Sequence, residues 1–208
     1  MRLHGKEVVT LLIDYDGTLM DSAERGLKCV NGVLKHYGVK PLSLAQYHEE
    51  FKQPFMDFYR QYIPGLTEDE EVKVYKNVAM KIPPDLRPDA EKVLRQLKEK
   101  GIRIAIVSCN GQEEIEYFLG QYGLKDIFFD IKGSILDKRI GIKEFMDKHS
   151  LDPETTVFLG DTDHDVISSR ANNLRVIAIK GGVSADHILE ALKPDLIISK
   201  FTDLLEIF

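Results

Sequence analysis

Short apolar runs rich in β-branched residues recur along the chain, and segments with helical periodicity separate them. The runs cover residues 8–13, 102–107, 127–131, 156–159, 174–179 and 195–198. Continuous apolar strands that alternate with helices are typical of a parallel sheet covered by helices on both faces. The pattern therefore predicts an α/β fold with a doubly wound, Rossmann-like parallel sheet.

The segments between the later runs show the periodicity of amphipathic helices. Apolar residues recur at positions 90, 93, 94 and 97, and Gly101 ends this pattern as a helix stop. Similar patterns predict further helices over residues 112–122, 140–149, 163–172 and 184–192. Ser184 would serve as the N-cap of the last of these helices.

Residues 21–82 interrupt the alternation, because they show helical patterns and no strand. A connection of this length is too long for a loop in a compact domain, so we expect a small helical domain inserted after the first strand. Pro83 and Pro84 would mark its exit. The predicted organisation is a core formed by residues 1–20 and 83–208 and a helical insert formed by residues 21–82.

The insert also carries a group of aromatic and basic side chains with two possible roles. The aromatic residues are Phe51, Phe55, Phe58, Tyr59 and Tyr62. They would form the core of a small helical bundle, or some of them would cover a site as a lid. Lys52 and Arg60 would meet a substrate anion or lie on a solvated face, which is the commoner location of such charges.

The composition limits the kinds of partner. Of the 208 residues, 43% are hydrophobic and 30% are charged, as expected for a globular protein with a packed core. The formal net charge of −6 opposes non-specific attraction to nucleic acid or to an anionic membrane, so we expect a small ligand. Two cysteines are too few for a disulfide scaffold, and the run 8–13 is too short for a signal peptide or membrane span. We therefore expect no targeting segment and a cytoplasmic location.

Two aspartates follow the first apolar run directly. Asp14 and Asp16 stand two residues apart, and Gly17 and Thr18 come next. Ligands of open parallel sheets bind at the carboxyl ends of the strands, so both carboxylates can face that crevice. A carboxylate can attack a phosphorus centre when a cation screens the repulsion, and Mg²⁺ prefers carboxylate and phosphate oxygens. The pair therefore indicates a nucleophile beside a general acid and base, with an acidic turn as the alternative.

A second acidic cluster follows the fourth predicted strand. Asp161, Asp163 and Asp165 would emerge at the same end of the sheet as the first pair, so the two clusters should converge. Either cluster could begin a calcium loop of the EF-hand type. In the second cluster, however, Val166 and Asn172 stand where that loop requires glycine and glutamate. The first cluster fails the same test, and the calcium loop is therefore rejected.

A third polar segment, Ser-Cys-Asn at residues 108–110, lies between a predicted strand and a predicted helix. A hydroxyl group at the N-terminus of a helix can donate hydrogen bonds to a phosphate oxygen together with the backbone amides. The same residue types are also common in ordinary turns and helix caps. Taken alone, this segment indicates either a phosphate contact or a cap.

In this order, the motifs resemble the haloacid dehalogenase superfamily of phosphohydrolases, and the resemblance covers nearly the whole chain. The family pattern runs Asp-x-Asp-Gly-Thr, then Ser or Thr, then a lysine, then Gly-Asp-x-x-x-Asp, each motif at a strand end or helix start. The resemblance implies a Mg²⁺-dependent phosphatase that acts on a small phosphorylated metabolite, phosphoglycolate-like or a sugar phosphate, through an aspartyl-phosphate. The helical insert resembles the cap of the phosphoglycolate-phosphatase-like branch.

Residue by residue, the resemblance implies a role for each motif. Asp14 would be the nucleophile and a metal ligand, and Asp16 the acid and base whose backbone carbonyl also binds the metal. Asp161 would be a further Mg²⁺ ligand, supported by Asp165. The expected phosphate contacts are Thr18, Ser108, Cys109, Asn110 and Lys138.

The lysine has to be chosen among candidates, because the Lys-Pro pair usual in this branch is missing. The candidates are Lys132, Lys138 and Lys143. We choose Lys138, which lies just ahead of the helix predicted over residues 140–149 and could reach the site while the helix packs outside. Lys143 would fall within that helix. Cys109 departs from the pattern, since it stands where the family often has asparagine, and Asn110 is its neighbour.

Four other functions share parts of this pattern. A phosphomutase would return the phosphoryl group to a substrate hydroxyl, but residues 51–54 do not resemble the basic, glycine-containing cap loop of sugar-phosphate mutases. A dehalogenase would not need Asp16. A phospho-receiver module has no room for the helical insert, and another non-catalytic phosphate-binding module would be favoured only if the protein with Mg²⁺ failed on every phosphate ester.

Overall fold

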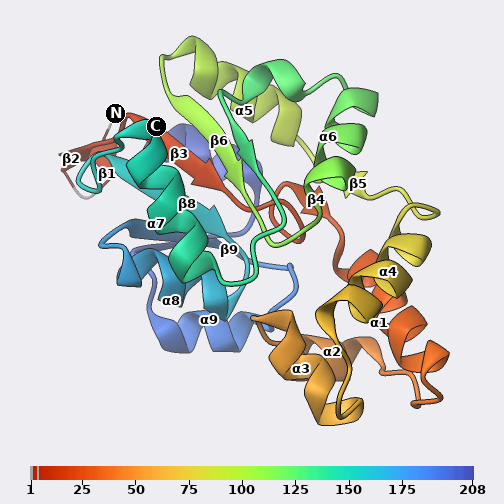
Figure 1. Ribbon diagram of the computed structural model, residues 1–208. Helices are drawn as coiled ribbons and strands as arrows, with labels where there is room; N and C mark the ends of the chain where they lie inside the picture. Colours follow the sequence, from red (N-terminus) through yellow and green to blue (C-terminus); the bar gives the residue numbers. More distant parts are fainter. Residues whose placement is uncertain (1, 4) are drawn as a thin grey trace.

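The apolar runs form one six-stranded parallel sheet with the strand order β10-β9-β8-β3-β6-β7 (Figure 1). This computed structural model describes residues 2–3 and 5–208. The strands are β3 (Thr10–Ile13), β6 (Arg103–Val107), β7 (Ile131–Lys132), β8 (Thr156–Gly160), β9 (Arg175–Ile179) and β10 (Leu196–Ile198). The predicted α/β class with a doubly wound parallel sheet is confirmed.

Successive residues of the central strands are buried on opposite faces of the sheet, and each face is covered by its own helices. The helices are α5 (Ala90–Glu99), α6 (Gln112–Gln121), α7 (Lys138–His149), α8 (Asp163–Ala171), α9 (Asp186–Leu192) and α10 (Leu204–Ile207). Leu11 and Ile13 pack in a cluster with residues of α5, α6 and α10. Leu12, between them, packs on the other face with residues of α7. This burial on both faces explains why the strands are continuously apolar.

The register of the sheet brings three strand ends level. Ile13, the last residue of β3, lies opposite Ile106 of β6 and Leu159 of β8. The residues that follow these strands therefore emerge at one carboxyl edge. The chain passes from β3 to β6 on one side and later to β8 on the other, so this edge is a switch point of the kind that binds ligands in open sheets.

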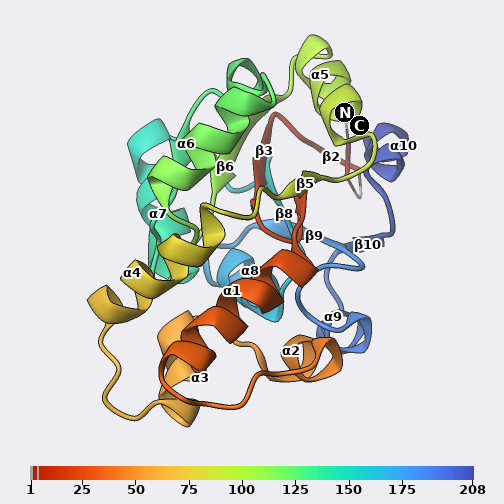
Figure 2. The same cartoon turned by 90° about the vertical axis from the view of Figure 1, so that its right-hand side faces the viewer.

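The helical insert (residues 21–82) contains α1 (Ala23–His36), α2 (Leu44–Glu50), α3 (Phe55–Tyr62) and α4 (Glu68–Ala79). These helices lie together at one end of the sheet (Figure 2) and enclose an apolar cluster that includes Val33, Phe58 and Tyr59. The side chains of Ser43 and Thr67 cap α2 and α4. The two segments at which the chain enters and leaves the insert form a small antiparallel ladder. They are β4 (Met20–Asp21) and β5 (Asp85–Leu86).

The strand predicted over residues 127–131 is wrong in its extent. A 3₁₀ turn, Lys125–Ile127, occupies its start, and only Ile131–Lys132 forms the edge strand β7. Phe128 packs into the cluster on one face of the sheet, and Phe129 packs against the ring of Phe145 on the other. The apolar run is therefore explained by burial against helices, which sequence periodicity cannot distinguish from a strand.

The predicted N-cap of the last long helix is also wrong. α9 begins at Asp186 with Ala185 as N-cap, and the hydroxyl of Ser184 instead accepts a hydrogen bond from the backbone of Asp163 at 3.2 Å. The polar start of the chain forms a short hairpin, β1 (Arg2–Leu3) with β2 (Lys6–Glu7). The expectation of no targeting segment rested in part on residues 1 and 4, which lie outside the described residues. Within residues 2–3 and 5–208, no helix has the length and apolar character needed to cross a membrane.

Candidate active site

A buried lysine joins two of the aspartates at the carboxyl edge of the sheet. The Nζ atom of Lys138 lies 2.7 Å from Oδ2 of Asp14 and 2.6 Å from Oδ1 of Asp165. Asp14 follows β3, Lys138 is the first residue of α7, and Asp165 lies in the first turn of α8. All three are buried. The structure thus brings together residues more than 120 positions apart in the sequence, since 138 − 14 = 124.

The other two lysine candidates lie elsewhere. Lys143 is exposed on α7 and pairs with Asp147, and Lys132 pairs with Glu144. α7 begins two residues earlier than predicted, because Asp137 caps it by accepting a hydrogen bond from the backbone of Arg139. Lys138 therefore belongs to the helix, as its first residue.

Burial dominates the electrostatics of this group. It raises the pKa of Asp14 to about 6, although the Lys138 ammonium acts in the opposite direction. It also acts to raise the pKa of Asp165, but the charge and hydrogen bond of Lys138 hold that pKa below its ordinary value. For Lys138, burial favours the neutral form, yet the two carboxylates raise its pKa above the ordinary value. The ammonium is therefore charged and fixed between the aspartates.

Asp161 is the third aspartate of the group, and its carboxylate is held by neutral donors. Thr18 Oγ1 donates to Oδ1 at 2.5 Å, and the backbone of Val183 donates to Oδ2 at 2.6 Å. A Cβ atom at Gly17 would lie 2.1 Å from this carboxylate, and Gly17 also has a positive φ of +71°. Burial, with the charges of Asp14 and Asp165, raises the pKa of Asp161 to about 8.

This arrangement fits a divalent cation. Oxygens of Asp14, Asp161 and Asp165 lie within 4.8 Å of one another. Lys138 offers one positive charge to three carboxylates, which leaves an excess of negative charge, and carboxylate oxygens suit Mg²⁺. One oxygen of Asp165 accepts from the backbone and hydroxyl of Thr162 and the other from Lys138. Asp165 is the most heavily hydrogen-bonded of the three, because each oxygen of Asp14 and of Asp161 has one such partner, so Asp14 and Asp161 keep more lone pairs to offer a metal.

Asp16 points to a different set of partners. Its carboxylate accepts hydrogen bonds from Ser22 Oγ and Asn110 Nδ2, both at 2.7 Å. The guanidinium of Arg25, in α1 of the insert, lies 3.7 Å away and forms a 2.7 Å ion pair with Glu114 of α6. A network between the insert and the core therefore joins the carboxylates of Asp16 and Glu114 to Asn110 and Arg25.

Ser22, Arg25 and Glu114 were not identified from the sequence. A signal for the last two was present, since each stands on the apolar stripe of its helix. Arg25 precedes Cys29 and Val33 at spacings of four, and Glu114 precedes Phe118 in the same way. A charged residue on a buried stripe requires a partner, because an unpaired buried charge is costly.

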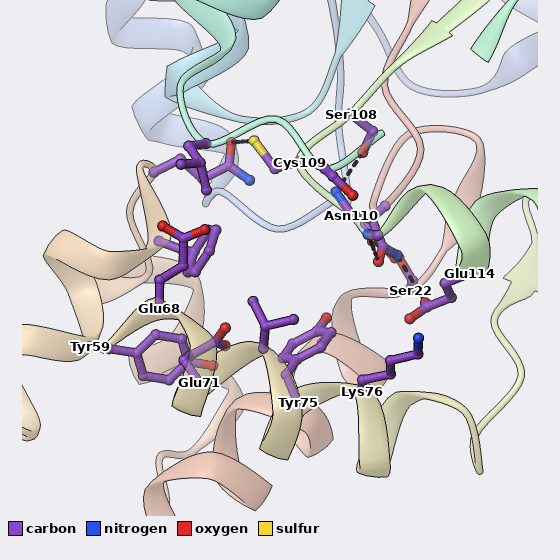
Figure 3. A pocket seen from close by; sticks show the side chains of 18 of the residues that line it. Ser22, Tyr59, Glu68, Glu71, Tyr75, Lys76, Ser108, Cys109, Asn110 and Glu114 are labelled. Carbon is purple, nitrogen blue, oxygen red and sulfur yellow. Dashed lines mark hydrogen bonds between the residues drawn. The ribbon is translucent and has the colours of Figure 1, made fainter. Parts of the chain in front are cut away.

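A cavity of about 740 Å³ separates the carboxyl edge of the sheet from the insert. Asp14, Asp16 and residues 108–110 line its core side. Tyr59, Glu71 and Tyr75 line the opposite wall (Figure 3). The cavity therefore joins the expected nucleophile, the expected acid and base, and the residues of the insert in one space.

The residues expected to contact phosphate differ in their partners and in whether they line the cavity. Ser108 lines the cavity, and its Oγ accepts from the backbone of Asn110 at 3.3 Å. The Asn110 side chain is bound to Asp16. The Thr18 hydroxyl is bound to Asp161, and Thr18 is fully buried and does not line the cavity. Cys109 lies 3.7 Å from Gln53 of the insert, and burial raises the pKa of its thiol to about 12. The thiol is therefore neutral and a weak ligand for phosphate.

Comparisons with known proteins show what the chain as a whole is similar to. The chain is 25% identical to a phosphoglycolate phosphatase of Synechococcus elongatus, over 94% of the chain and 95% of that protein. It is 26% identical to the pyrophosphatase PpaX of Bacillus mycoides, over 97% of each. A solved haloacid dehalogenase-like hydrolase from Streptococcus pneumoniae has the same fold, with a TM-score of 0.81 and 22% identity over 96% of this chain and 97% of that one. Residues 11–179 match the model of the haloacid dehalogenase-like hydrolases, and the chain belongs to that family.

Proposed function

We propose that this hydrolase is a Mg²⁺-dependent phosphatase of small organic phosphate monoesters that forms an aspartyl-phosphate on Asp14. The observation that supports this best is the position of Asp14, which lines the cavity while Lys138 lies 2.7 Å from its carboxylate. A carboxylate at the wall of a cavity can meet a substrate. The buried ammonium beside it places positive charge where a phosphoryl group would arrive.

In the first step, an oxygen of Asp14 attacks phosphorus in line, the Asp14–phosphorus bond forms, and the bond to the ester oxygen breaks. Asp16 gives its proton to the leaving alkoxide. In the second step, Asp16 takes a proton from water, which attacks the aspartyl-phosphate and releases inorganic phosphate. Lys138 and Ser108 stabilise the charge on the equatorial phosphoryl oxygens in both steps.

Asp14 and Asp161, with the backbone carbonyl of Asp16, would hold Mg²⁺. The ion would supply charge neutralisation between the phosphoryl oxygens and the carboxylates. Burial and the charges of Asp14 and Asp165 raise the pKa of Asp161 to about 8, and a cation held between these carboxylates would favour their ionised forms.

Residues 21–82 would act as a cap domain on the core of residues 1–20 and 83–208. This role is supported by the apolar cluster of the insert, to which Val183 is the core's contribution, and by the cavity that lies between the two parts. A cap that closes over the cavity would exclude bulk water from the phosphoryl transfer. The expected substrate is a small phosphorylated metabolite in the cytoplasm. Binding to nucleic acid or to a membrane is not expected.

Hydrolysis of a generic aryl phosphate, followed by release of inorganic phosphate, tests this function. We expect turnover in Mg²⁺ and at least about a hundredfold less in excess chelator, because carboxylate and phosphate repel each other without a cation. Full activity in chelator, or no activity on any ester in Mg²⁺, would contradict the proposal.

A further inference from the structure

The wall that the insert contributes to the cavity carries mainly carboxylates and aromatic rings. The acidic residues are Glu68, Asp69 and Glu71 of α4, and the rings include Tyr47, Phe51, Tyr59 and Tyr75. In Figure 3, Glu68, Glu71, Tyr59 and Tyr75 lie on this wall, across the cavity from Ser108 and Asn110. A leaving group bound to the phosphoryl group at Asp14 would therefore face these residues.

Two polar groups of this wall, the carboxyl of Glu71 and the hydroxyl of Tyr59, are buried beside the cavity. Glu71 is 3% exposed, and burial raises its pKa to about 7. Tyr59 is 1% exposed, and its hydroxyl lies beside the Glu71 carboxyl without a hydrogen bond of full geometry among the described residues. The hydroxyl is near enough to lower the pKa of Glu71 in part, but burial outweighs it. Unsatisfied buried groups are costly, and a ligand that satisfies them gains affinity.

Positive charge is scarce on the same wall. Lys73 and Lys76 line the cavity, but both are exposed, and Lys76 pairs with Glu113 at 2.6 Å. Arg25 is held by Glu114 and by the carbonyls of Ala79 and Ile82. Glu68 and Asp69 are exposed as well, so the buried charge-bearing group that α4 contributes is the carboxyl of Glu71. A carboxylate or second phosphate on the leaving group would meet this carboxyl and no buried cation among the described lining residues.

The two basic residues considered from the sequence do not change this balance. Arg60 pairs with Asp57 on the exposed side of α3, and neither Arg60 nor Lys52 lines the cavity. The aromatic residues are divided between the two expected roles. Phe58 is in the apolar cluster of the insert, whereas Phe51, Phe55 and Tyr59 also line the cavity.

We propose that Glu71 and Tyr59 select monoesters with an uncharged, hydroxyl-bearing leaving group, such as a sugar phosphate, over esters that carry a second anionic group. This inference rests on the proposed phosphatase function and names its substrate class. A substrate hydroxyl would hydrogen-bond with the Glu71 carboxyl and the Tyr59 hydroxyl, and the rings of the wall would pack against its carbon skeleton. The cavity volume of about 740 Å³ exceeds what a two-carbon acid would fill.

The test compares kcat/KM in Mg²⁺ for a hexose 6-phosphate with that for phosphoglycolate and for pyrophosphate. The wild-type protein should favour the hexose phosphate by at least about tenfold, because a like charge in the pocket weakens binding. Glu71→Gln should reduce this preference by about tenfold, mainly through KM, and Tyr59→Phe should reduce it in the same direction. Glu24→Gln, which removes an exposed carboxylate of α1 outside the cavity, should keep the wild-type preference.

A second measurement separates this inference from the phosphatase function. Asp14→Asn lacks the nucleophile, so calorimetric binding of the three phosphates to it reports the preference of the pocket without turnover. Tighter binding of the hexose phosphate, reduced when Glu71→Gln is added, supports the inference even if no ester is hydrolysed. A wild-type preference for phosphoglycolate or pyrophosphate overturns it, as does a preference that neither Glu71→Gln nor Tyr59→Phe changes.

Discussion

Lys138 is the residue on which the charge balance of the site depends. Its ammonium is fully buried between Asp14 and Asp165, whereas Lys143, five residues later, pairs with Asp147 at the surface. Lys138→Ala should lower kcat on an aryl phosphate by at least about a hundredfold, because it removes charge stabilisation from the transferring phosphoryl group. Lys143→Ala should change kcat less than about twofold. Equal losses, measured in folded variants by phosphate release, would contradict the assignment of Lys138.

Glu71 gives a residue-level prediction about stability. Its folded-state pKa of about 7 lies above the ordinary value of 4.5, because burial and the charge of Glu68 outweigh the Tyr59 hydroxyl. Below pH 4.5 the group is protonated in both states, so it has no effect. Between pH 4.5 and 7 the unfolded state releases the proton first, so the folded state loses stability, and above pH 7 the loss is complete.

The variant Glu71→Gln lacks this titration. Its free energy of unfolding, relative to wild type, should therefore rise between pH 4 and pH 8, by up to roughly 3 kcal/mol. Urea unfolding at both pH values measures the difference. If the difference in free energy of unfolding between the variant and the wild type is the same at pH 4 and pH 8, the carboxyl of Glu71 is ionised normally in the folded protein. The proposed environment of Glu71 would then be wrong.

At the scale of elements, the junction between α1 and α6 contains a buried ion pair. Arg25 and Glu114 lie 2.7 Å apart and are 4% and 5% exposed. Removing one partner leaves a buried charge without compensation, so Arg25→Met should lower the free energy of unfolding by roughly 3 kcal/mol. The double variant Arg25→Met with Glu114→Gln should recover part of this loss, because the buried charge of Glu114 is then removed as well.

The exposed pair of Lys143 and Asp147 on α7 is the matched control for this cycle. Its side chains are 69% and 66% exposed, and the corresponding loss should stay below about 0.5 kcal/mol. Urea unfolding of the four variants in each cycle gives both coupling energies. A coupling between Arg25 and Glu114 no larger than that of the exposed pair would mean that this contact does not hold the insert on the core.

For the whole molecule, the sequence was sufficient to predict the sheet and the meeting of its strand ends. Continuous apolar runs indicated buried parallel strands, and their register placed Asp14, Ser108 and Asp161 at one edge. Local patterns determine these features, so they can be predicted from the sequence. The edge segment around Phe128 and Phe129 was mispredicted, because burial between helices imitates a strand.

The network around Asp16 could not be predicted in the same way. It depends on how α1 of the insert packs on α6, which places Arg25 beside a residue 89 positions away. No local pattern specifies that packing. The burial of Glu71 could not be predicted from the sequence either, because the sequence shows only a helix with a strongly acidic first turn at α4.

The central claim is that Asp14 receives the phosphoryl group and that Asp16 handles the protons. Rapid-quench experiments with an aryl phosphate test it, because this leaving group departs without protonation. Asp16→Asn should form the phosphorylated protein and hydrolyse it slowly, so the intermediate should accumulate, whereas Asp14→Asn should show none. Covalent phosphate on Asp14→Asn, or wild-type steady turnover by Asp16→Asn, would contradict the account.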